Sequence, residues 1–164
     1  MFLKKQFFAL CFLLFVFNFS NAQIEVAHIS SKDFNALGFG AFLNFSIPVS
    51  EANYVTVEGG LQSFKDKNTN ELALFPVLAG YRYTLNQTGS GFYIEPNVGY
   101  TFSVSDYGDY AGAAAGIGAG YLVDLGNIPF NFGLRYEHSF GNPSTNVFSF
   151  RIAHSFGFGK KRDD

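Results

Sequence analysis

Two segments near the end of the chain alternate bulky and small residues at every second position. In Ile128–Phe140 and in Val147–Phe158, every even-numbered residue is apolar, aromatic or histidine, whereas the odd-numbered residues are mostly small, polar or charged. A period of two is the side-chain period of a β-strand, because successive side chains point to opposite faces of a sheet. Each segment therefore predicts a strand with one bulky, apolar face. That face would point inward in a soluble sandwich or barrel, and outward at lipid in a membrane barrel.

The N-terminal residues have the pattern of a secretory signal peptide at 1–22. Met1–Lys5 is basic, residues 7–19 are mostly apolar, and small residues lead up to Ala22. The apolar run is shorter than the roughly 20 residues that a membrane-spanning helix needs. We expect cleavage after Ala22, which also removes Cys11, the single cysteine. The mature chain would then have no disulfide and no thiolate metal site.

The mature chain is predicted to form one domain. We expect a barrel at residues 23–159 and a charged tail at 160–164. Without Lys4 and Lys5, the 11 basic residues fall to nine against 13 acidic ones, a net charge of −4. This charge argues against a nucleic-acid partner, which would require a basic face. No other stretch is long and apolar enough for a membrane helix, so any insertion must use strands.

The same alternation recurs upstream and predicts six more strands. Their segments are, in order, Gln23–Ser30, Asn35–Ile47, Tyr54–Phe64, Leu72–Leu85, Gly91–Ser105 and Ala111–Leu125. The first has the weakest alternation. The last is rich in alanine, but glycines at alternate positions would cost a helix about 1 kcal/mol each, which favours a strand. Pro76 and Pro96 lie inside two segments and remove backbone donors, so we interpret them as bulges or positions near the rim.

Counting the weak first segment gives eight strands, and the connections support that number. Short turns alternate with longer loops, the turns near 48–53, 86–90 and 124–127 and the loops near 65–71, 106–110 and 141–146. Bacterial membrane barrels have even strand numbers and short periplasmic turns. The predicted fold class is therefore all-β: an eight-stranded antiparallel up-and-down transmembrane β-barrel.

Placing the small and charged faces inward gathers a balanced set of charges inside the barrel. The set comprises three acids and three bases, with Glu25 as a candidate fourth acid: Glu58, Arg82, Glu95, Arg135, Glu137 and Arg151. Charges away from water must be paired and hydrogen-bonded, and an eight-stranded barrel is just wide enough for side chains to fill. We therefore predict a ladder of ion pairs, a plugged interior and no sizeable channel.

The aromatic content favours the membrane arrangement over a soluble barrel. The chain has nine tyrosines and 22 phenylalanines, seven of the latter within residues 1–22, a heavy load for a small core. Aromatic residues also recur near the ends of the apolar faces, as the two interfacial girdles of a membrane barrel require. Two alternatives stay open: a soluble lipocalin-like barrel that binds an apolar ligand, and a narrow porin-like channel.

These patterns resemble the small eight-stranded outer-membrane barrels of the OmpA/OmpX type and, in texture, the secreted barrels of Bacteroidetes-like bacteria. The likeness covers nearly all of the mature chain. Its most specific part resembles the C-terminal signal that the barrel assembly machinery reads, at Arg151, Ala153, Phe156 and Phe158. Ala153 stands where glycine is usual, and six residues follow Phe158. The resemblance implies a monomeric Gram-negative outer-membrane protein without a peptidoglycan-binding domain, with outer-membrane lipid and the assembly machinery as partners.

The sequence carries no motif that predicts catalysis, a cofactor or a metal. Glycine-rich Gly112–Gly120 lacks the GK[ST] of a phosphate loop, and the three histidines do not have metal-ligand spacing. Outer-membrane lipid A deacylases place a catalytic histidine and serine two positions apart. Here His138 and Ser139 are adjacent and fall on opposite faces, with Phe140 where the serine would be. We therefore expect a non-enzymatic barrel with a structural or surface-interaction role through its loops.

Overall fold

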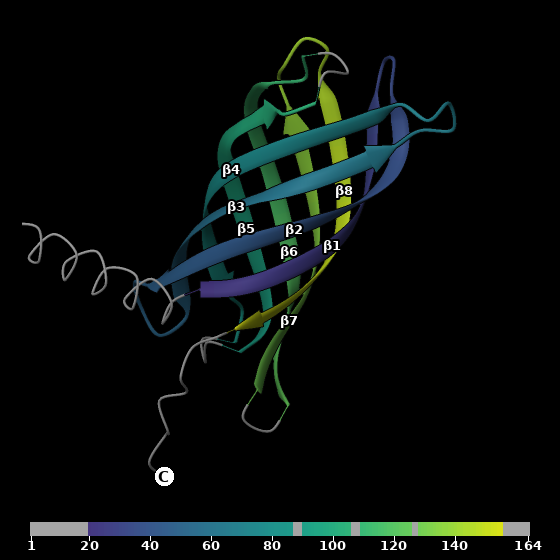
Figure 1. The fold of residues 1–164 in the computed structure, drawn as a ribbon. Coiled ribbons are helices and arrows are strands. Elements are labelled where there is room, and N and C mark those ends of the chain that lie inside the picture. Colours follow the sequence, from purple (N-terminus) through teal and green to yellow (C-terminus); the bar gives the residue numbers. More distant parts are fainter. Residues whose placement is uncertain (1–19, 87–89, 106–108, 126–127, 156–164) are drawn as a thin grey trace, which may run out of the picture.

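The computed structural model describes residues 20–86, 90–105, 109–125 and 128–155. Within these ranges the chain forms the strands β1 (Ser20–Ser31), β2 (Asn35–Pro48), β3 (Asn53–Lys65), β4 (Glu71–Thr84), β5 (Gly91–Ser103), β6 (Gly112–Leu125), β7 (Ile128–Ser139) and β8 (Thr145–Ser155). Each strand pairs antiparallel with its sequence neighbours, and β8 pairs with β1 to close the barrel (Figure 1). The predicted eight-stranded up-and-down barrel is confirmed.

The segment with the weakest alternation is a full strand. β1 pairs along most of its length with both β2 and β8, and it starts at Ser20 because Ser20–Ala22 continue the pairing with residues 43–45 of β2. Cleavage after Ala22, as predicted, would shorten the strand by these three residues. Most of the predicted signal peptide and the whole predicted tail, 160–164, lie outside the described residues. Across the described ranges, no helix is long and apolar enough to cross a membrane.

The strands have lengths suited to a bilayer. They contain 11 to 14 residues. At about 3.3 Å per residue and a tilt near 45°, strands of this length rise roughly 26–33 Å. The hydrocarbon core of a typical bilayer is about 30 Å thick. The C-terminal ends of β2, β4, β6 and β8 lie at one end of the barrel, called here the turn end. The C-terminal ends of β1, β3, β5 and β7 lie at the other, called the loop end.

Pro76 and Pro96 interrupt pairing without producing bulges, so our interpretation of these two prolines was wrong. Both lie well inside their strands, away from the rim. Pairing between β3 and β4 lapses beside Pro76, and pairing between β4 and β5 lapses beside Pro96, yet the register is the same on both sides of each gap. A bulge would insert a residue and shift the register. Proline adds no residue but has no backbone N–H to donate. The strand therefore loses one backbone hydrogen bond to one adjacent strand, and pairing then resumes in the same register.

The outer face of the barrel is apolar and the inner face is largely polar and charged. Large apolar side chains point outward, with Phe39 72 % exposed and Leu37 67 %, whereas Glu58 and Arg135 are 3 % and 1 % exposed inside the barrel. The predicted assignment of faces therefore holds in the structure. It is the reverse of a soluble barrel, which buries its apolar face.

The interior is not uniformly polar. At the loop end, buried apolar side chains from five strands and two connections form one cluster: Ala27, Ile29, Phe34, Ala36, Phe64, Leu72, Leu74, Tyr110 and Val147. Phe34 and Tyr110, from two different connections, meet edge to face with ring centroids 6.4 Å apart. The sequence interpretation gave the inward faces as small, polar and charged and did not gather apolar side chains at one end, so this loop-end cluster is an addition to it.

Candidate functional site: the charged interior

The first charge centre of the interior is the carboxylate of Glu58 on β3. It accepts hydrogen bonds from Arg135 on β7 and from Arg151 on β8, whose Nη1 lies 3.1 and 3.3 Å from the two carboxylate oxygens. The amides of Gln23 and Asn44 each donate to Oε2 at 3.2 Å. All five side chains are buried. The charge and lone pairs of Glu58 are thus matched by donors, as a carboxylate held away from water requires.

Arg135 joins this centre to two further acids. Its guanidinium lies 3.2 Å from Glu25 on β1 and 3.8 Å from Glu137 on its own strand, and it stacks on the ring of Phe42 with 4.9 Å to the centroid. β3 and β7 stand four places apart in a ring of eight strands, so the contact between Arg135 and Glu58 crosses the full width of the barrel. The forked guanidinium, with five donors, suits such a bridge between carboxylates on several strands.

A second charge centre lies nearer the turn end, where Arg82 on β4 faces Glu95 on β5. Nε of Arg82 lies 2.5 Å from Oε2 of Glu95, and the Thr56 hydroxyl donates to Oε1 at 3.1 Å. The guanidinium also stacks on Tyr93, 4.6 Å from the ring centroid. By register the two charged residues are direct neighbours at the gap beside Pro96. The ion pair therefore joins β4 and β5 where their backbones are not paired.

Tyr93 depends on glycine at the two strands it reaches. Its hydroxyl donates to Asn131 Oδ1 at 2.8 Å. A Cβ at Gly120 or Gly133 would lie 2.6 or 2.7 Å from the Tyr93 hydroxyl oxygen. The absence of side chains at these two positions lets the tyrosine extend across the wall of the barrel from β5 to β7.

The buried charges include one more acid than base among the residues that the structure describes. Glu25, the candidate fourth acid, is 3 % exposed and bonded to Arg135 and to the Gln62 amide, which donates at 2.5 Å. Glu137 is the least well partnered. Thr101 donates to its Oε1 at 3.0 Å, while Oε2 accepts no hydrogen bond within the described part of the chain.

The structure places all six residues of the predicted charge network inside the barrel, each 6 % exposed or less. Sequence reasoning missed the neutral and aromatic partners that hold these charges: Gln23, Phe42, Asn44, Thr56, Gln62, Tyr93 and Thr101. The alternation in the sequence could have identified them, because each lies at an inward-facing position of its strand. In the predicted assembly signal, Arg151 and Ala153 are buried in the interior. Phe156 and Phe158 lie outside the described residues, so that signal stays a prediction.

The described residues do not bring Ser139 and His138 together, and they contain no metal-binding cluster. Ser139 is 1 % exposed on the inner face, whereas the His138 ring lies on the outer face and bonds Asn146 at 2.9 Å. A serine and a histidine on opposite sides of a strand cannot make the contact that nucleophile activation needs. Within the described ranges, no three His, Cys, Asp or Glu side chains gather as a metal site.

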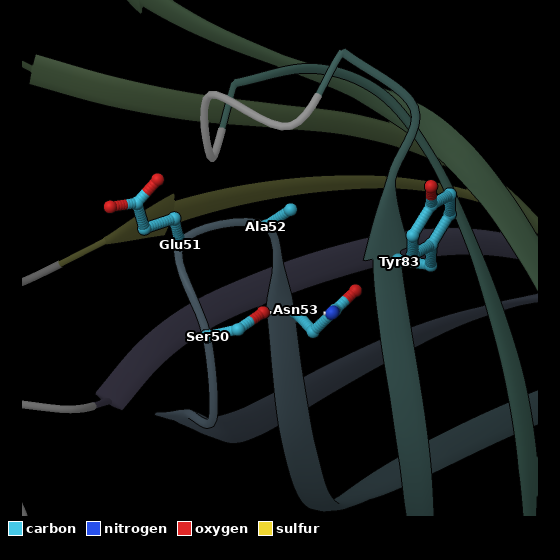
Figure 2. A pocket seen from close by; sticks show the side chains of 5 residues that line it. All are labelled: Ser50, Glu51, Ala52, Asn53 and Tyr83. Carbon is cyan, nitrogen blue, oxygen red and sulfur yellow. Dashed lines mark hydrogen bonds between the residues drawn. The ribbon is translucent and has the colours of Figure 1, made fainter.

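A hollow of about 410 Å³ at the turn end is lined by Ser50, Glu51, Ala52, Asn53 and Tyr83. Figure 2 shows the Glu51 carboxylate directed away from Tyr83, with the lining side chains spread around the opening. The Asn53 amide donates to Ser50 Oγ at 2.8 Å, a contact within the turn. The hollow thus gathers no convergent polar groups, unlike a ligand site.

A closed eight-stranded barrel with apolar side chains outside and ion pairs inside has the arrangement of small bacterial outer-membrane barrels. No family model and no curated protein matches the chain in sequence. Solved structures match it in fold. Neisserial surface protein A (NspA) superposes with a TM-score of 0.63 at 14 % identity, covering 84 % of this chain and 96 % of NspA.

Two further structures share the fold. Ail, the attachment invasion locus protein of Yersinia pestis, has a TM-score of 0.55 at 11 % identity, covering 83 % of this chain and 95 % of Ail. The N-terminal β-barrel domain of Pseudomonas aeruginosa OprF has a TM-score of 0.54 at 15 % identity, covering 82 % of this chain and 96 % of the domain. The expected likeness to small eight-stranded outer-membrane barrels is confirmed at the level of the fold. A Bacteroidetes-like origin stays a prediction.

Proposed function

We propose that the protein is a non-enzymatic, integral outer-membrane barrel with a plugged interior and a structural or surface-interaction role. The observation that carries the proposal is the inverted polarity of the wall. Every strand contributes at least one large apolar side chain to the exposed outer face, for example Ile24, Phe39, Val55, Phe75, Phe92, Ile117, Phe132 and Phe148. Apolar surface in water costs about 25 cal/mol per Å², and a continuous belt far exceeds the patches that soluble proteins expose.

Two layers inside the barrel support the plug. The bridge from Glu58 to Arg135 crosses the barrel at mid-height. The loop-end cluster fills the outer end with apolar side chains, and Ile29, Phe64 and Leu72 in it are fully buried. Ions would have to break the first layer and shed their water in the second, so we expect no steady conductance.

The connections at the loop end support a surface role. They would face the exterior if the termini lie on the periplasmic side, as in bacterial barrels. NspA is named as a surface protein and Ail as an attachment invasion locus protein, which agrees with a role at the cell surface.

Fractionation and gel mobility test the proposal. The expressed protein should stay in the outer-membrane pellet and run faster on a gel without boiling, because a closed barrel resists detergent. Recovery in the soluble periplasm, with no mobility shift, would reverse the proposal and favour a lipocalin-like barrel. In planar bilayers the folded protein should give no steady current. A steady current that changes in Arg82→Ala would contradict the plug and favour a narrow pore.

A further inference from the structure

One half of the outer face carries a row of polar side chains above the apolar belt. The row crosses four consecutive strands near the loop end. Register pairs His138 on β7 with Asn146 on β8, Asn146 with Ser30 on β1, and Ser30 with Asn35 on β2. All four side chains are half-buried or exposed. We call these four residues the polar row.

Polarity decreases in steps below the polar row. The next row of register neighbours is mixed: Tyr136, Phe148, His28 and Leu37. The row after it is wholly apolar: Leu134, Phe150, Val26 and Phe39. This order, from polar through mixed to wholly apolar, follows the change from headgroups to acyl chains in a bilayer leaflet.

Hydrogen bonds within this face orient its asparagines as donors. Oδ1 of Asn146 accepts from the Tyr136 hydroxyl at 2.6 Å and from Nδ1 of His138 at 2.9 Å. Oδ1 of Asn35 accepts from Nε2 of His28 at 3.1 Å. With both oxygens engaged, the two amide NH₂ groups can donate outward. Such a donor-rich edge suits an acceptor-rich, anionic ligand.

The opposite half of the loop-end rim differs. There Lys65 on β3 and Glu71 on β4 form an ion pair at 3.0 Å, so the Lys65 ammonium already has an anionic partner. Phe75 and Phe102 are exposed beyond it and are register neighbours on β4 and β5. The donor-rich edge therefore belongs to the face made by β7, β8, β1 and β2.

An apolar groove of about 330 Å³ lies below the mixed row, on β1, β2 and β8. It is lined by Ile24, Glu25, Val26, Phe39, Gly40, Phe150 and Ile152. Val26 is two residues from His28 on the outer face of β1, and His28 bonds Asn35, so the mixed row connects the groove to the polar row. The groove also belongs to the apolar belt, whose proposed contact is lipid.

We propose that this face binds a phosphorylated lipid of the leaflet at the loop end, with the phosphate on the polar row and an acyl chain in the groove. The inference rests on the membrane placement proposed above. Three strand spacings separate His138 from Asn35, roughly 14 Å, so the row is wide enough to meet a headgroup through several donors. A phosphate with uncapped oxygens should bind better than one covered by choline.

Co-purification from vesicles tests the inference. The barrel is inserted into phosphatidylcholine vesicles that contain a minor share of phosphatidic acid with the same acyl chains. Folded protein is then extracted in detergent, and the retained lipids are quantified by mass spectrometry. We expect phosphatidic acid to be enriched roughly tenfold over its share in the vesicle, the factor that one charge-assisted hydrogen bond can supply.

The double variant Asn35→Ala/Asn146→Ala should lose most of this enrichment. Asn53→Ala, the same change at the turn-end rim, should keep it, and both variants should retain the gel mobility of a folded barrel. Equal enrichment in wild type and double variant, or none in wild type, would overturn the inference. So would displacement of the lipid by inorganic phosphate, since that marks a site for a free anion. Failure of the wild-type protein to insert at all would instead refute the membrane placement itself.

Discussion

Removing one member of the Arg82–Glu95 pair should destabilise the barrel strongly. The two side chains are 7 % and 2 % exposed, with 2.5 Å between Nε and Oε2. In Arg82→Met, Glu95 keeps the hydroxyl of Thr56 but loses its counter-charge, and in Glu95→Gln a buried guanidinium faces a neutral amide. Breaking a buried pair from one side typically costs 3–5 kcal/mol, so we expect a loss of about 3 kcal/mol from each single change. The double variant should regain at least about 2 kcal/mol of the summed loss.

The pair between Lys65 and Glu71 is a matched control. These residues also face each other on adjacent strands, at 3.0 Å, but their side chains are 59 % and 68 % exposed. Solvent screens such pairs, which typically contribute 0–1 kcal/mol. Lys65→Met and Glu71→Gln should therefore each change the free energy of unfolding by less than about 1 kcal/mol, and their effects should add.

Urea unfolding in detergent micelles measures both cycles, with the folded fraction read from the faster band on unheated gels. The comparison of Arg82→Met with Lys65→Met is decisive, because both changes remove a cation and keep a similar chain length. If both cost the same, or if the Arg82→Met/Glu95→Gln double variant loses the full sum of its singles, the pair does not stabilise the barrel as a buried charge couple.

Three other predictions follow from single contacts. Gly133→Ala places a Cβ 2.7 Å from the Tyr93 hydroxyl and should cost about 1–3 kcal/mol of stability, less in a Tyr93→Phe background, by the same gel assay. Leu72→Ala, at a fully buried position of the loop-end cluster, should cost about 2–5 kcal/mol. The pKa of Asp66 lies below its usual 3.8. Desolvation acts to raise this pKa, but hydrogen bonds from Asn70 to the carboxylate outweigh it. Because the folded pKa is the lower one, these bonds persist at neutral pH and weaken as the pH falls below 3.8, which amide exchange at Asn70 should record.

Alternation along the chain predicted which side of the wall each side chain faces. Glu58 and Arg135 could be assigned to the interior because their neighbours at alternate positions are small or polar. Face assignment does not give depth along the barrel axis, however. Phe64 and Leu72 also lie at inward positions, and only pairing between strands shows that they meet at one end, with Phe34 and Tyr110 from the connections. The loop-end cluster was missed for that reason.

The pairing register between strands also could not be predicted from the sequence. Proline in a strand predicts a local irregularity in the pairing. It does not distinguish a β-bulge, which adds a residue, from the loss of one backbone hydrogen bond. At Pro96 the structure has the missing bond, with Arg82 and Glu95 bridging the same place. The ion-pair partner of an inward charge was likewise beyond sequence reasoning. Glu58 forms its ion pairs with Arg135 on β7 and Arg151 on β8, and neither strand is adjacent to β3.

The bridge between Glu58 and Arg135 has a consequence for the order in which the protein folds. The two residues are 77 positions apart in sequence, and no single hairpin contains both. Hairpins made of neighbouring strands can form early, since their contacts are local, but contacts of such long separation form slowly and pay a large loop-closure entropy first. The bridge can therefore stabilise only the completed ring. It slows unfolding of the closed barrel. Removing the bridge should therefore raise the unfolding rate and leave the folding rate nearly unchanged.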